Sequence, residues 1–192
     1  GLRHAPSPRR PGVTGRGWGR APALHTKCAR FRKCSRALEF LMKILVQKFG
    51  GTSVADLECQ KKVLAKVKRG LDNGYKVVAV LSARHGDTNN LLALAREWSA
   101  QPDPAECDSL VSTGEQVSIS LFTMLLKDNG IKARSLLAWQ IPLITDDSFG
   151  SARIESIDGE AIRKLFNDYD VLVIAGFQGK TADGRITTLG RG

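Results

Sequence analysis

The chain has 192 residues, enough for one domain with a buried core, and a formal net charge of +10. Residues 1–41 hold ten Lys and Arg against the single acid Glu39, whereas residues 42–192 hold nineteen basic and eighteen acidic side chains. The body is therefore nearly neutral, which disfavours nucleic acid as its partner, and no apolar run reaches the eighteen residues of a membrane span.

The first 41 residues are rich in Gly, Pro, Arg and Ser, so we expect a disordered basic tail. It has three interpretations: a nucleic-acid-binding arm, an organelle transit peptide, or non-native sequence before a start at Met42. We favour the third, because Met42 directly precedes the first predicted strand. The four cysteines lack the paired spacing of a zinc site and indicate a reducing compartment. We therefore expect a soluble cytoplasmic protein without a protein-bound metal, or an organelle protein if the tail is a transit peptide.

The first predicted strand, 44–46, leads into a polar segment made of Lys48, Gly50, Gly51, Thr52 and Ser53. A glycine pair lets the backbone approach an anion and adopt torsion angles that other residues resist. Its N–H groups and the start of the following helix can then face a phosphate, with Lys48 adding a positive charge. Because the lysine precedes the glycines, this is not the Walker A pattern. On these residues alone, a phosphate-binding loop and a plain left-handed turn both stay open.

Strands and helices alternate along residues 42–192, the predicted catalytic region. Apolar runs predict strands at 77–81, 133–138 and 171–175, and helical periodicity predicts helices at 54–69, 91–98, 107–129 and 157–167. We expect loops at 82–90 and 142–150, and a small hairpin turning at 183–184. This alternation predicts an α/β fold with a mainly parallel sheet, helices on both faces, and ligands bound at the carboxyl ends of the strands.

Polar residues follow the predicted strands, where a ligand is expected. In the loop 82–90 we interpret Arg84, His85 and Asp87 as parts of a solvated turn. If a helix opens at the segment 111–117, Glu115 lies in its first turn, where an acid complements the helix dipole, and Ser112 or Thr113 is the expected N-cap.

Several of these segments, in this order, resemble the aspartate kinases of the amino-acid kinase superfamily. They are K-F-G-G-T-S-V (48–54), S-A-x-x-x-x-T-N (82–89), S-T-G-E-Q-V (112–117), W-Q-I-P-L-I-T-D-D-S (139–148), A-G-F-Q-G (175–179) and T-T-L-G-R-G (187–192). The resemblance covers residues 43–192 and implies a three-layer α/β/α sandwich of the carbamate kinase-like type.

The resemblance implies a transferase that uses ATP and Mg²⁺, held through the ATP phosphates, to convert L-aspartate to 4-phospho-L-aspartate. This is the first step toward lysine, threonine and methionine. Lys48 is the implied catalytic residue, and the implied phosphate-binding residues are Lys48, Gly50, Gly51, Thr52 and Ser53. The implied substrate-binding residues are Ser82, Thr88, Glu115 and Arg191. Among these, Glu115 pairs with the substrate ammonium and Arg191 grips a carboxylate.

In the family, the pattern continues past Gly192 with a further glycine, a serine and an aspartate, then with adenine-binding and regulatory segments. We therefore expect a chain truncated at the C-terminus, with little or no kinase activity alone, and a homo-oligomer when full length. Two alternatives stay open: a kinase for glutamate, acetylglutamate, carbamate or a nucleotide, and a non-catalytic regulatory or binding fragment. Glu115 and the T-L-G-R string favour aspartate.

Overall fold

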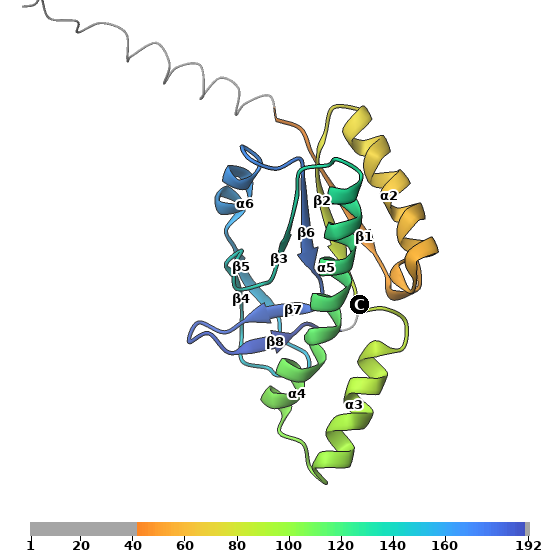
Figure 1. Ribbon diagram of the computed structural model, residues 1–192. Coiled ribbons are helices and arrows are strands. Elements are labelled where there is room, and N and C mark those ends of the chain that lie inside the picture. Colours follow the sequence, from red (N-terminus) through yellow and green to blue (C-terminus); the bar gives the residue numbers. More distant parts are fainter. Residues whose placement is uncertain (1–41, 191–192) are drawn as a thin grey trace, which may run out of the picture. The chain divides into compact units, whose positions relative to one another are not determined.

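The computed structural model describes residues 42–190, so the expected basic tail and Arg191 lie outside the described residues. Four parallel strands form the central sheet, in the order β1–β2–β6–β3 (Figure 1). They are β1 (Ile44–Phe49), β2 (Lys76–Leu81), β6 (Val171–Ala175) and β3 (Ala133–Leu136). All five residues of β6 are buried, as expected for a central strand that is covered on both faces.

Helices cover both faces of this sheet. Two long helices, α2 (Leu57–Asp72) and α5 (Thr113–Asp128), pack on one face, and the short helix α6 (Gly159–Leu165) lies on the other (Figure 1). Because strand side chains alternate, Val77, Ala79, Val171 and Val173 enter the first core, whereas Val78, Leu172 and Ile174 enter the second. The predicted α/β sandwich with a mainly parallel sheet is confirmed.

A second sheet was not foreseen. Its order is β5–β4–β7–β8, with β4 (Leu143–Thr145), β5 (Ile154–Ile157), β7 (Gln178–Lys180) and β8 (Ile186–Thr188). The predicted loop at 142–150 is therefore wrong at β4, because a three-residue strand is too short to show a period and depends on distant partners. The predicted hairpin at 183–184 is confirmed as the turn between β7 and β8.

The predicted helix boundaries also need correction. The stretch 107–129 is two helices, α4 (Pro104–Val111) and α5, with Ser112 between them. The predicted helix at 157–167 begins only at Gly159, because Ile157 ends β5 and the Asp158 carboxylate accepts a hydrogen bond from the N–H of Ala161 (2.9 Å). No helix within residues 42–190 is long and apolar enough to cross a lipid bilayer.

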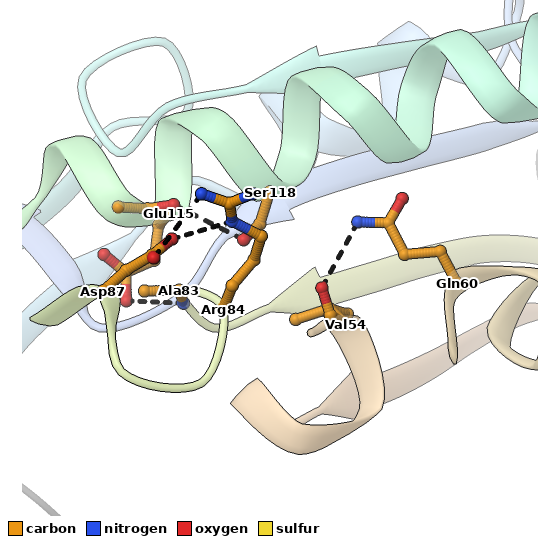
Figure 2. Close-up of polar contacts among 8 residues, drawn as sticks. Val54, Gln60, Ala83, Arg84, Asp87, Glu115 and Ser118 are labelled. Carbon is orange, nitrogen blue, oxygen red and sulfur yellow. Dashed lines mark hydrogen bonds and ion pairs between the residues drawn. The ribbon is translucent and has the colours of Figure 1, made fainter. Parts of the chain in front are cut away.

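The second glycine of the pair begins a 3₁₀ helix, η1 (Gly51–Val54), where the start of an α-helix was predicted at Val54. Helix α2 follows at Leu57, where the Asp56 carboxylate accepts a hydrogen bond from the N–H of Cys59 (2.8 Å). The buried side chain of Gln60 donates to the carbonyl of Val54 (3.4 Å) and joins the two helices (Figure 2). The N-terminus of α2 is thus capped by the protein's own Asp56.

Candidate active site

The loops that follow β1, β2 and β6 are bonded to one another at the carboxyl edge of the parallel sheet. The N–H of Ser82 donates to the carbonyl of Phe49 (3.1 Å), and the N–H of Gly176 donates to that of Leu81 (2.8 Å). The N–H of His85 donates to the carbonyl of Gly51 (3.2 Å). The three loops therefore form one rim, at the edge where parallel sheets bind their ligands.

A cavity of about 490 Å³ opens at this rim. Its lining comprises Lys48, Gly51, Ser82, Ala83, Arg84, Gly86, Thr88, Asn89, Glu115, Phe177, Leu189 and Gly190. Five of the nine predicted site residues therefore meet in one pocket: Lys48, Gly51, Ser82, Thr88 and Glu115. Gly50, Thr52 and Ser53 do not line it, and Arg191 lies outside the described residues.

The two glycines after β1 differ in whether their positions could hold a larger side chain. Neither has a positive φ, so the left-handed turn and the expectation of unusual torsion angles are both wrong here. A Cβ at Gly51 would lie 2.8 Å from the carbonyl oxygen of Ala83, whereas a Cβ at Gly50 would meet nothing within 4 Å. Gly51 is therefore required for the close approach of the loops after β1 and β2.

Helix α3 (Asp87–Trp98) supplies the next part of the pocket. It begins inside the segment predicted as a loop, because Gly86 has a φ of 89° and turns the chain directly into the helix. Thr88 and Asn89 therefore stand on the first turn of α3, where both line the pocket.

Glu115 is the most unusual group in the pocket, since its side chain is an acid with a relative exposure of only 2%. One carboxylate oxygen accepts a hydrogen bond from the N–H of Ala83 (2.9 Å), and Figure 2 shows this contact. The other oxygen is buried and has no partner among the described residues. Burial raises the pKa of Glu115 to about 7, with the charge of Asp87 adding to the effect. A buried acceptor without a donor is suited to an incoming cation.

The residues before Glu115 do not cap α5 as predicted. Ser112 has helical torsion angles, and its hydroxyl donates to the carbonyl of Ser109 (2.8 Å). The hydroxyl of Thr113 donates to the carbonyl of Leu110 (2.7 Å). Helix α4 therefore runs almost directly into α5, so both hydroxyls bond back to α4.

Two cations, Lys48 and Arg84, also line the pocket. Lys48 lies at the end of β1, with an exposed side chain that makes no hydrogen bond or ion pair with residues 42–190 in the structure. Arg84 pairs with Asp87 (2.8 Å), and their side chains are 39% and 22% exposed. Arg84 is therefore part of the pocket wall, which corrects its interpretation as part of a purely solvated turn.

Phe177 was missed by sequence reasoning. It is the one non-glycine residue with a positive φ, 62°, among the described residues, and it lines the pocket. Backbone strain of this kind collects at functional sites. The sequence did offer a signal, because Phe177 lies two residues after the apolar strand β6, within the A-G-F-Q-G segment of the family resemblance.

Asp108 on α4 fixes another wall of the pocket. Its buried carboxylate accepts hydrogen bonds from the N–H of Thr188 (2.8 Å), from the hydroxyl of Thr188 (2.7 Å) and from the N–H of Gly150 (2.9 Å). Thr188 directly precedes Leu189 and Gly190, which line the pocket. This acid therefore holds the end of β8 in place, although no pattern in the sequence indicated it.

Comparison with known proteins places this pocket in context. Residues 43–192 match the model of the amino acid kinase family. The chain is 48% identical over 151 residues to an aspartate kinase of Pseudomonas putida, which covers 79% of this chain and 37% of the relative. The chain thus spans well under half the length of that relative.

Solved structures give the same result. The chain resembles E. coli aspartokinase III in complex with lysine and aspartate, with a TM-score of 0.66, 28% identity and coverage of 78% of this chain and 44% of the other. It resembles the same enzyme in complex with aspartate and ADP, with a TM-score of 0.61, 28% identity and the same coverage.

Proposed function

Because this chain belongs to the amino acid kinase family, we propose that its pocket is the amino-acid side of an aspartate kinase active site. The proposed reaction is ATP + L-aspartate → ADP + 4-phospho-L-aspartate, which opens the biosynthesis of lysine, threonine and methionine. Its support is the set of relatives named aspartate kinase and the neighbouring structure that contains aspartate and ADP.

One observation carries the choice of an amino acid as acceptor: the partnerless carboxylate oxygen of Glu115, buried in a pocket that also contains Lys48. A substrate ammonium would complete the hydrogen bonding of Glu115 and favour its ionised form. A carboxylic acid without an amino group offers no such partner. Ser82 and Thr88 add hydroxyl groups to the lining of the same pocket.

The chemical step is direct phosphoryl transfer. A side-chain carboxylate oxygen of L-aspartate forms a bond to the γ-phosphorus, the bond from this phosphorus to the bridging oxygen breaks, and ADP leaves with the electron pair. The acceptor is already ionised at neutral pH, so no general base is required. Two anions must meet, and Lys48 lowers their repulsion as they approach.

Mg²⁺ enters this proposal with ATP, whose phosphate oxygens are its usual ligands. Residues 42–190 contain no group of three His, Cys, Asp or Glu side chains that could hold a metal ion by themselves. No step is therefore assigned to a protein-bound metal.

Calorimetric titration tests the substrate class. The 192-residue chain should bind L-aspartate, and succinate, which lacks the ammonium, should bind at least about tenfold more weakly. Glu115→Ala should remove this preference, whereas Glu97→Ala, at an exposed position on α3, should keep it. Equal affinity for L-aspartate and succinate would refute the assigned role of Glu115.

A second titration tests the phosphate side with inorganic tripolyphosphate. Lys48→Ala should weaken its binding about tenfold, because a charge-assisted hydrogen bond is lost. Lys62→Ala, at an exposed position on α2, is the matched control. A cytoplasmic location and a homo-oligomeric state belong to the same proposal, and analytical ultracentrifugation checks the second.

A further inference from the structure

We propose that Arg84 is an anion-binding residue of this pocket. Its guanidinium would break its ion pair with Asp87 and bind an anionic oxygen of a substrate instead. The inference rests on the proposed function, because it concerns the same pocket. The anion is a carboxylate of the amino acid or the terminal phosphate of the nucleotide, two groups that share the geometry a guanidinium recognises.

The ion pair leaves most of the guanidinium free. Its Nε donates to one carboxylate oxygen of Asp87 at 2.8 Å, but the second contact, from Nη2, is 3.5 Å long and contributes little. A guanidinium has five N–H donors, and this one forms no other hydrogen bond or ion pair with residues 42–190. The remaining donors are therefore available to a ligand.

The position of the pair places this cation where anions must arrive. Arg84 follows Ala83, whose N–H holds the Glu115 carboxylate, and Figure 2 shows Arg84 and Asp87 beside that group. Lys48 is the other cation among the described lining residues, and Glu115 is the acid. If Glu115 binds the substrate ammonium, Lys48 and Arg84 are the lining cations that remain to bind the anionic groups of the substrates.

Competition with Asp87 is easy for a ligand. The two side chains are 39% and 22% exposed, and ion pairs this accessible to water contribute little to stability. Asp87 thus holds the guanidinium at the rim without binding it tightly. A purely structural pair would act differently, since each partner would then matter equally for the shape of the loop.

The test compares the two partners of the pair. Calorimetry on the 192-residue chain measures the affinity for inorganic tripolyphosphate and, separately, for L-aspartate. Arg84→Gln should weaken at least one of these two affinities about tenfold. The affinity of Arg84→Lys should lie between those of the unsubstituted chain and Arg84→Gln, because lysine keeps the charge but loses the planar fork. Asp87→Asn should leave both affinities unchanged or raise them, because it removes the competitor.

Arg163→Gln is the matched control, since Arg163 forms an exposed ion pair with Glu160 three residues away, outside the pocket. Circular dichroism melts confirm that each variant is folded. If Arg84→Gln loses affinity for tripolyphosphate alone, Arg84 binds the phosphate. If it loses affinity for L-aspartate alone, Arg84 binds the carboxylate.

Two results would overturn the inference: unchanged affinities in Arg84→Gln, or an equal loss in Arg84→Gln and Asp87→Asn. These results leave the proposed function standing if the unsubstituted chain binds both ligands. If the unsubstituted chain binds neither ligand, the proposed function fails and the inference fails with it.

Discussion

Replacing Glu115 by Gln should change how the stability of the protein depends on pH, even without a ligand. The Glu115 side chain is 2% exposed, and burial raises its pKa from 4.5 to about 7. Between these values the folded state binds more protons than the unfolded state, so the free energy of unfolding falls as pH rises. The shift corresponds to about 3 kcal/mol at about 1.4 kcal/mol per pH unit.

The introduced glutamine cannot ionise in this range, so the variant loses this pH dependence. Its amide oxygen can still accept the N–H of Ala83, and any cost of burying its NH₂ group is independent of pH. The stability of Glu115→Gln relative to the parent should therefore rise by about 3 kcal/mol between pH 4.5 and pH 8.

Urea unfolding followed by circular dichroism, at five pH values from 4.5 to 8, measures this difference directly. Glu97→Gln, a change of the same chemistry at an exposed position on α3, serves as the control. A stability difference between Glu115→Gln and the parent that stays constant over the whole range would refute the reasoning from burial.

Three further outcomes follow from the same pocket. The affinity for L-aspartate should fall about fivefold between pH 7 and pH 6, because an ionised Glu115 must meet the ammonium; calorimetry showing an affinity independent of pH contradicts this. Gly51→Ala should lower stability by about 1–3 kcal/mol and weaken tripolyphosphate binding, since its Cβ would lie 2.8 Å from a carbonyl oxygen. Gly50→Ala, whose Cβ meets nothing within 4 Å, should change neither property, and equal effects of the two would be inconsistent with the packing. Asp108→Ala should cost at least about 2 kcal/mol in urea unfolding, because two backbone N–H groups lose their acceptor; a loss below about 0.5 kcal/mol speaks against this role.

The central sheet was predictable because the apolar runs that mark its strands can be recognised in the local sequence. The apolar runs of β2 and β6 are long enough to be recognised, and alternation with helices implies parallel pairing. The meeting of the three loops then follows from geometry, since carboxyl ends of parallel strands share one edge. This is why Lys48 and Ser82 could be expected near one another, whereas Glu115, on helix α5, was indicated by the family resemblance.

The second sheet depends on contacts that the local sequence does not encode. Strand β4 has three residues and pairs with β7, more than thirty positions later, and all four residues of β5 are exposed. Such strands show no hydrophobic period in the sequence. Whether these segments form strands depends on their pairing with segments that are distant in the chain.

Site residues were missed for a related reason. The requirement for glycine at position 51 comes from the loop after β2 and not from its own torsion angles. The roles of Arg84 and Asp108 depend equally on groups brought close by the fold. A sequence pattern shows which residues are present, whereas the roles of these residues depend on the groups from other segments that the fold brings into contact with them.

Acyl phosphate formation tests the proposed activity most directly. Residues 42–192 would replace the matching segment of the Pseudomonas putida aspartate kinase, and the hybrid would be incubated with ATP, Mg²⁺ and hydroxylamine to trap the product. We predict a hydroxamate with L-aspartate that is lost in Lys48→Ala and Glu115→Ala and kept in Lys62→Ala. A folded hybrid that forms no hydroxamate with L-aspartate, or forms it only with another acid such as L-glutamate, would contradict the proposed function.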